Sequence, residues 1–263
     1  MYKRQQSQYS YAPNGTAAIN AQTIYSREQV QAAQRASVTR AYGEMTLGLI
    51  ITAVVAVVAQ MTGAYVSFIE STGLIGFFGF AIVQVVLAVA LGARIMKIKA
   101  STARVMFYVY AALMGFTLSS IFLVYSISDI GVALVLCAAF FFVLTMFSLT
   151  TKFDMLKAGP ILMVGLVVLI ISQIVLMFVP GSTTGMRIIC AFGLILFAGM
   201  TLYDAQQTRA LFSAYEAQGP EMIKKISIIC ALNLYLDFVN MFLYILQPVS
   251  YTHLRAHETS LHL

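Results

Sequence analysis

A single hydrophobic segment, residues 226–247, carries a row of polar side chains along one helical face. It is long enough to cross a bilayer, which takes about 20 apolar residues. Polar residues recur within it at steps of three or four, so a helix places them in one stripe. They are Asn233, Asp237, Asn240 and Tyr244. A carboxyl group near the membrane centre costs about 2.5 to 3.5 kcal/mol on insertion scales. Asp237 is therefore expected to face a protein interior or a water-filled cavity, with a partner.

A second acid, Asp204, lies near the end of the preceding apolar segment. Acids within a membrane segment commonly mark an ion or proton pathway. Simpler interpretations remain open for both residues. Asp204 alone could be a solvated acid at the membrane interface, and Asp237 could merely hold helices together with Asn233 and Asn240.

The composition is that of a membrane protein. Of the 263 residues, 60% are hydrophobic and only 10% are charged, whereas a soluble domain has about 25% charged residues. The net charge of +6 does not indicate a nucleic-acid partner, because the basic residues lie between the apolar segments and no nucleic-acid-binding motif is present. The three cysteines give neither a disulfide framework nor a metal site. No cofactor motif is visible.

Seven apolar segments predict an all-α polytopic membrane protein that is surrounded by the lipid bilayer. Nearly all are longer than a barrel strand of about 9 to 11 residues, and none alternates in polarity. Ala111, Gly115 and Ser119 are four residues apart, a spacing that predicts close helix packing. The segments cover about 45–66, 73–93, 105–125, 130–149, 160–179, 186–204 and 226–247.

The connections between these segments predict the orientation. Fourteen of the sixteen Lys and Arg residues lie before the first segment or in alternate connections. The other two, Arg187 and Arg255, belong to the opposite side. The positive-inside rule therefore places the N-terminus in the cytoplasm and the C-terminus outside.

Two stretches flank the membrane domain, which covers residues 41–247. Residues 1–40 are polar and are expected to form a mostly disordered cytoplasmic tail. Residues 26–42 could form a surface helix that leads into the membrane. Residues 248–263 look non-native, since they contain all three histidines of the chain. Histidines on a flexible end are a poor metal site, because nothing orients them.

Several short motifs stand out within the segments. They are Phe197-Ala-Gly-Met-Thr-Leu-Tyr-Asp-Ala-Gln-Gln207, Leu234-Tyr-Leu-Asp-Phe-Val-Asn240, Tyr108-Val-Tyr-Ala-Ala-Leu-Met-Gly115, Leu118-Ser-Ser-Ile-Phe122 and Thr150-Thr-Lys152. Together they resemble the transmembrane Bax-inhibitor-motif family, bacterial branch. The resemblance covers roughly residues 40 to 247.

This resemblance implies a seven-helix bundle in which six helices surround a hydrophobic last helix. It also implies that the aspartates of the last two helices, Asp204 and Asp237 by motif match, hydrogen-bond to each other. In the family this pair is a pH sensor that gates a calcium leak. An arginine of the second helix is linked to the closed state in some members. Arg94 is the nearest candidate here, although it is also suited to anchoring the helix at the cytoplasmic interface.

The chemistry of such a pair follows from its residue types. Two carboxyl groups in a low dielectric cannot both ionise cheaply, so they would share one proton. Raising the pH removes this proton, and repulsion then separates the two helices. A calcium ion could bind the resulting dianion transiently, because hard cations prefer carboxylate oxygens. Thr201, Asn233 and Asn240 are expected to hydrogen-bond around the pair.

These observations favour a pH-sensitive calcium leak channel in a bacterial inner membrane. One alternative is a regulatory membrane protein that binds a membrane protease or stress factor and conducts nothing, as is described for some bacterial members of the family. An enzyme is not expected. Intramembrane aspartyl proteases carry Gly-x-Gly-Asp, whereas Leu234, Tyr235 and Leu236 precede Asp237 here.

Overall fold

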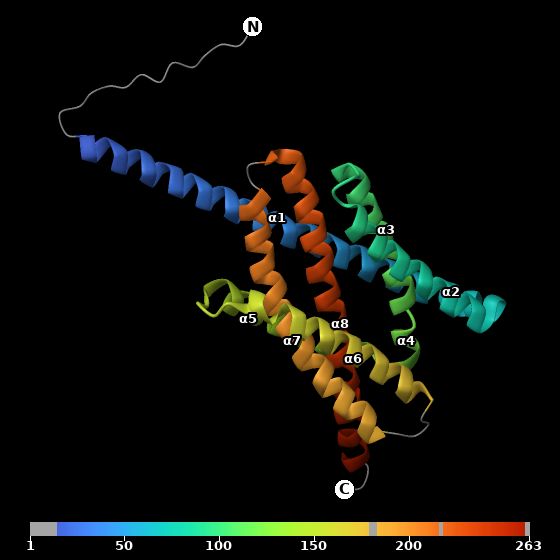
Figure 1. The fold of residues 1–263 in the computed structure, drawn as a ribbon. Coiled ribbons are helices and arrows are strands. Elements are labelled where there is room, and N and C mark those ends of the chain that lie inside the picture. Colours follow the sequence, from blue (N-terminus) through green and yellow to red (C-terminus); the bar gives the residue numbers. More distant parts are fainter. Residues whose placement is uncertain (1–14, 179–182, 216–217, 261–263) are drawn as a thin grey trace.

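The computed structural model describes residues 15–178, 183–215 and 218–260, and within these ranges the chain is helical, without a strand. Seven stretches of the described helices are long and apolar enough to cross a membrane. The all-α architecture with seven spans is therefore confirmed (Figure 1). The elements are α1 (Gly15–Thr62), α2 (Ala64–Arg94), α3 (Ala100–Leu118), α4 (Ile121–Val124), α5 (Ile127–Thr150), the 3₁₀ turn η1 (Met155–Ala158), α6 (Gly159–Met177), α7 (Thr183–Tyr215) and α8 (Pro220–Ser260).

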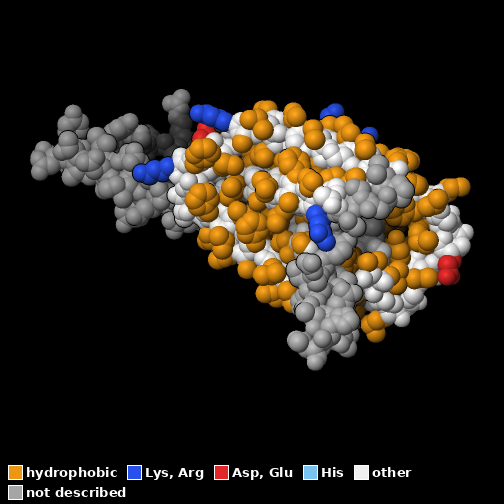
Figure 2. All heavy atoms as spheres, turned by 90° about the horizontal axis from the view of Figure 1, so that it is seen from below, with side chains coloured by type: hydrophobic (Ala, Val, Ile, Leu, Met, Phe, Trp, Pro, Cys, Tyr) orange, Lys and Arg blue, Asp and Glu red, His pale blue; other side chains and the backbone are white. Residues whose placement is uncertain are grey.

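The last helix, α8, forms the centre of the bundle. In the most apolar stretch of α8, 72% of the residues are buried inside the protein. In the corresponding stretch of every other described span, this share is 33% or less. Helices α1, α3, α5 and α7 all pack against it, and Figure 1 shows it between α7 and α3. The prediction of a central last helix is confirmed. The outer surface of the bundle is apolar. Figure 2 shows hydrophobic side chains over most of the visible face and few charged ones.

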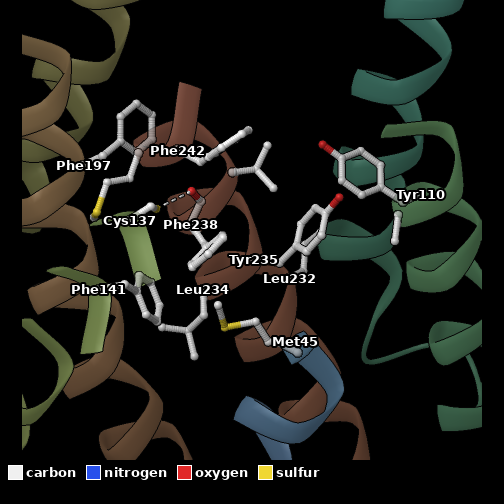
Figure 3. Close-up of a cluster of buried hydrophobic side chains, with 14 of the residues drawn as sticks. Met45, Tyr110, Cys137, Phe141, Phe197, Leu232, Leu234, Tyr235, Phe238 and Phe242 are labelled. Atoms are coloured by element: carbon white, nitrogen blue, oxygen red, sulfur yellow. Dashed lines mark hydrogen bonds between the residues drawn. The ribbon is translucent and has the colours of Figure 1, made fainter. Parts of the chain in front are cut away.

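Tyr235 ties α8 to two neighbouring helices. Its hydroxyl lies 2.6 Å from Thr52 Oγ1 of α1, and Thr52 Oγ1 donates to the carbonyl oxygen of Ala111 in α3 at 2.9 Å. On another side of α8, the Cys137 thiol of α5 donates to the Phe238 carbonyl at 3.6 Å (Figure 3). Such partners satisfy polar groups that no water could reach, so they help to hold α8 in register.

Glycines mark the break between the first two spans. Gly63 has φ 66° and separates α1 from α2, and Gly73 within α2 has φ 61°. These left-handed conformations suit glycine because it has no Cβ. The sequence predicts a first segment that runs to Val66, whereas α1 ends at Thr62 and α2 begins at Ala64. Residues 64–72 form a helical stretch that precedes the kink at Gly73, and the second predicted segment begins at this kink.

Both terminal helices are longer than the sequence predicts. Helix α1 begins at Gly15 and therefore includes residues 15–40 of the tail. Its many Ala, Gln and Arg residues are good helix formers. Helix α8 continues past Gln247 and through Pro248 to Ser260. Residues 1–14 and 261–263, which the sequence also assigns to the two tails, lie outside the described residues.

The connections rich in Lys and Arg meet at one end of the bundle, called the basic end below. Here the backbone N–H of Ala100, after the α2–α3 turn, donates to Glu221 Oε1 at the start of α8 (2.8 Å). Lys225 Nζ donates to the Met96 carbonyl oxygen across the same interface (3.2 Å). The α2–α3 and α7–α8 connections thus lie on the same side.

Gly115 is expected to be sensitive to even one added carbon. It packs against the backbone of α1, where a Cβ would lie 3.0 Å from Cα of Thr52. We expect Gly115→Ala to lower the free energy of unfolding by about 1–3 kcal/mol, because the packed helices must separate. Thermal unfolding in detergent measures this loss. Gly131→Ala is the matched control, since nothing lies within 4 Å of the Cβ it adds. Equal effects of the two variants would contradict the packing argument.

Candidate functional site

The polar stripe of α8 lines one hollow of the bundle. This hollow has a volume of about 570 Å³ and is bounded by α6, α7 and α8, with Val85 contributed by α2. Its lining includes all four residues of the stripe, Asn233, Asp237, Asn240 and Tyr244. The helical spacing seen in the sequence thus places them on one face, as predicted. An acid that would be costly against lipid faces a cavity instead.

Asp204 of α7 lies beside Asp237 of α8. The packing of α7 on α8 brings the two side chains within hydrogen-bonding range. Both are buried, with 7% of Asp204 and 1% of Asp237 exposed. A hydrogen bond between two carboxyl groups requires a proton on one of them, since carboxylates are acceptors only. The pair can therefore hold one proton, and losing it would leave two like charges in contact.

Two polar residues that the sequence analysis missed lie close to this pair. Tyr42 of α1 is near both aspartates and beside Thr145 of α5. The Tyr42 hydroxyl, Thr145 Oγ1 and Asp237 Oδ2 are buried, and none makes a hydrogen bond with another described atom. Such atoms are normally satisfied by protein or by ordered water. This cluster is therefore a polar spot within the core. No motif in the sequence around Tyr42 or Thr145 predicts their place beside the acid pair, because each residue belongs to a different helix from the two aspartates.

The predicted neighbours of the pair divide into two groups. Thr201 is fully buried, lies within hydrogen-bonding range of Asp237 and donates to the Phe197 carbonyl oxygen at 2.8 Å. Asn233 and Asn240 are half-buried in the wall of the hollow. The Asn240 amide donates to the Leu236 carbonyl oxygen at 2.7 Å. Thr201 thus lies next to Asp237, whereas the two asparagines contribute polar lining.

Arg94 is not among the described residues that contact the acid pair. It is exposed in the last turn of α2, and no ion pair among the described residues joins its side chain to Asp204 or Asp237. This position fits the alternative interpretation, an anchor at the membrane interface.

The pair offers too few ligands for a resident metal ion. The described residues contain no group of three or more His, Cys, Asp or Glu side chains that could hold one. Calcium takes about 6–8 oxygen ligands, so water and carbonyl oxygens would have to supply most of them here. The donor set therefore fits brief binding of a hydrated cation better than a permanent site.

A second polar cluster joins α1 to α3. Glu44 is buried, and its Oε1 lies 2.6 Å from an Nη of Arg104. The Tyr108 hydroxyl donates to the other carboxylate oxygen of Glu44, also at 2.6 Å. The sequence predicts nothing of this network, because its members belong to separate helices. Its buried carboxylate has both a cation and a hydrogen-bond donor, so it is suited to a structural role.

Comparison with known families covers the whole membrane-spanning part of the chain. Residues 34–252 match the family described as "Inhibitor of apoptosis-promoting Bax1". The match includes the seven spans and both aspartates of the pair. The chain belongs to the Bax inhibitor-1 family. Membership confirms the resemblance of the motifs and, with the seven apolar helices, makes the chain an integral membrane protein.

Three similar proteins align with the chain over most of their length. The chain is 33% identical to the inner membrane protein YbhL of Escherichia coli over 219 residues, 83% of this chain and 93% of YbhL. An uncharacterized protein of Borreliella burgdorferi is 32% identical over 208 residues, 79% of this chain and 88% of the relative. The uncharacterized protein YrjE of Lactococcus lactis is 31% identical over 211 residues, 80% of this chain and 88% of the relative.

Proposed function

We propose that this Bax inhibitor-1 family protein is a pH-sensitive calcium leak channel gated by Asp204 and Asp237. The observation that carries the proposal is a buried pair of acids beside a hollow of about 570 Å³. With a shared proton, the pair holds α7 and α8 together. When that proton leaves at higher pH, repulsion between two poorly hydrated carboxylates pushes the helices apart.

Calcium is the proposed ion because of the chemistry of the lining. Hard divalent cations prefer carboxylate, carbonyl and water oxygens. The hollow offers the two carboxyl groups together with the side-chain oxygens of Asn233, Asn240 and Tyr244. An opened pair would therefore place negative charge and oxygen ligands along a single path.

The proposed location is a bacterial inner membrane, as in the name of the similar Escherichia coli protein. The basic end lies in the cytoplasm under the positive-inside rule. The opposite end of α8 then faces outward.

Calcium flux into proteoliposomes is expected to rise by about tenfold or more between about pH 5 and pH 8, because deprotonation opens the pair. A fluorescent calcium indicator inside the vesicles measures this flux, and protein-free vesicles set the background. A folded protein that passes no calcium at any pH would contradict the channel proposal.

A regulatory role is the second candidate, and one observation favours it. Helix α1 begins at Gly15 and extends well beyond the bundle (Figure 1), so it could present a surface to a membrane protease or stress factor. Partner co-purification that is lost on deleting residues 6–40, together with no ion flux, would support this role.

A further inference from the structure

A second hollow continues the first along the same face of α8. The hollow that contains Asp204 and Asp237 is called the inner hollow here. The outer hollow has a volume of about 420 Å³, includes Met186 and Cys190, and lies where α6 ends and α7 begins, away from the basic end. The two hollows share three lining residues, Gln173, Asn240 and Tyr244.

The polar row of α8 continues through both hollows. Gln247 follows Tyr244 by three residues, lines the outer hollow and accepts a hydrogen bond from the Cys190 thiol at 2.6 Å. Polar residues thus recur from Asn233 to Gln247 on one helical face. Within a membrane, a row of this kind is tolerated where it meets protein partners or water.

A hydrogen bond crosses the junction between the hollows. The Gln173 amide of α6 donates to the Tyr244 hydroxyl of α8. The Tyr244 ring stacks on Phe197 of α7, with 5.8 Å between ring centroids. The ring also packs directly against Gly193 of α7, where an added Cβ would lie only 2.6 Å from it. The ring is thus held against α7 while its hydroxyl reaches across to α6.

We propose that the Gln173–Tyr244 hydrogen bond is a constriction that separates the inner hollow from the outer one in a water-filled path along α8. The proposal rests on the proposed channel function and adds to it a closure distinct from the acid pair. Breaking this bond requires little unpacking. Helix α6 packs mainly on α7 and η1, and only 6% of the most apolar stretch of this span is buried. Once the acid pair has opened, ions therefore pass only during the intervals in which the Gln173–Tyr244 hydrogen bond is also broken.

Access of a charged thiol reagent tests the constriction without any measurement of ion flux. A single cysteine is introduced into each hollow in a Cys190→Ala background, Met186→Cys in the outer hollow and Met200→Cys in the inner one. A trimethylammonium methanethiosulfonate reagent is added to spheroplasts, which expose the outer face of the membrane. Cys190→Ala alone measures the background from the two remaining buried cysteines.

With the hydrogen bond intact, Met186→Cys is expected to react quickly and Met200→Cys slowly. Adding Gln173→Leu or Tyr244→Phe raises the labelling rate of Met200→Cys by about tenfold and leaves that of Met186→Cys unchanged, because a lost hydrogen bond frees α6. Gly193→Ala displaces the ring with both bonding residues present and has the same effect. Gln84→Leu is the matched control, since Gln84 joins α2 to α3 through Thr117 Oγ1 (2.8 Å).

The labelling rates decide the proposal in each case. An unchanged rate for Met200→Cys in all three variants would overturn the constriction, provided that each variant elutes as a single folded species. An unreactive Met186→Cys would overturn the water-filled outer hollow. Because labelling reports access only, a protein that passes no calcium can still show the constriction. Failure of the channel function is thereby distinguished from failure of this inference.

Discussion

Replacing Asp237 with asparagine is expected to make calcium flux insensitive to pH between about 5 and 8. The amide cannot ionise, so the pair no longer shares a proton and deprotonation no longer creates two adjacent charges. Asp204→Asn should have the same consequence from the other helix, since each carboxyl group supplies half of the repulsion. Flux ratios between the two pH limits, measured in proteoliposomes, should fall to about 1 in both variants.

A matched acid-to-amide control tests whether the effect belongs to the pair. Glu70→Gln removes an exposed acid of α2 and should retain the pH response of the unmodified protein. If Asp204→Asn and Asp237→Asn both retain that response, the pair is not the pH sensor. If Glu70→Gln also abolishes it, the response reflects surface charge rather than a gate.

Removing the cation from the Glu44 network is expected to produce the largest loss of stability. In Arg104→Met, the Glu44 side chain, only 8% exposed, would stay buried and lose its ion-pair partner. Breaking a fully buried ion pair costs about 3–5 kcal/mol. The Arg104 side chain is 41% exposed, so a loss of about 2–3 kcal/mol in the free energy of unfolding is expected. Thermal or denaturant unfolding in detergent measures it.

A double-mutant cycle separates the energy of the Arg104–Glu44 ion pair from the other effects of removing the Arg104 side chain. Glu44→Gln combined with Arg104→Met should be less destabilised than Arg104→Met alone, because no buried charge is left unpaired. Arg209→Met is the matched control. Its guanidinium donates to the Leu149 carbonyl oxygen from an exposed position (2.8 Å), so its loss should cost less than about 1 kcal/mol. Additive single effects in the cycle would contradict a coupled network.

The sequence alone predicted the features that depend on local pattern. Long uncharged runs predicted seven apolar helices, because backbone groups within a bilayer must be satisfied internally and a helix does this in one segment. The period of 3.6 residues predicted that Asn233, Asp237 and Asn240 share a face, and all three line the inner hollow. The small residues Ala111 and Gly115 predicted close packing, and both are buried.

Helix ends were predicted less well, because hydrophobicity alone does not locate a turn. The boundary between α1 and α2 is a single glycine in a left-handed conformation, whereas the apolar pattern continues past it. The same pattern ended the last helix at Gln247, although α8 continues through Pro248. Hydrophobic length indicates which residues can enter a membrane, and backbone conformation determines where the helix stops.

The spacing of residues along the chain establishes which side chains share a face of each helix. Which faces meet was decided by tertiary packing. The spacing within α7 and α8 could not bring Asp204 to Asp237, and only the family resemblance implied their contact. Tyr42, Thr145, the Arg104–Glu44 ion pair and the Gln173–Tyr244 hydrogen bond each join different helices. Such contacts depend on how closely two helices pack. Small residues help to set this distance, because Gly115 leaves room for a neighbouring backbone and Gly193 leaves room for a ring.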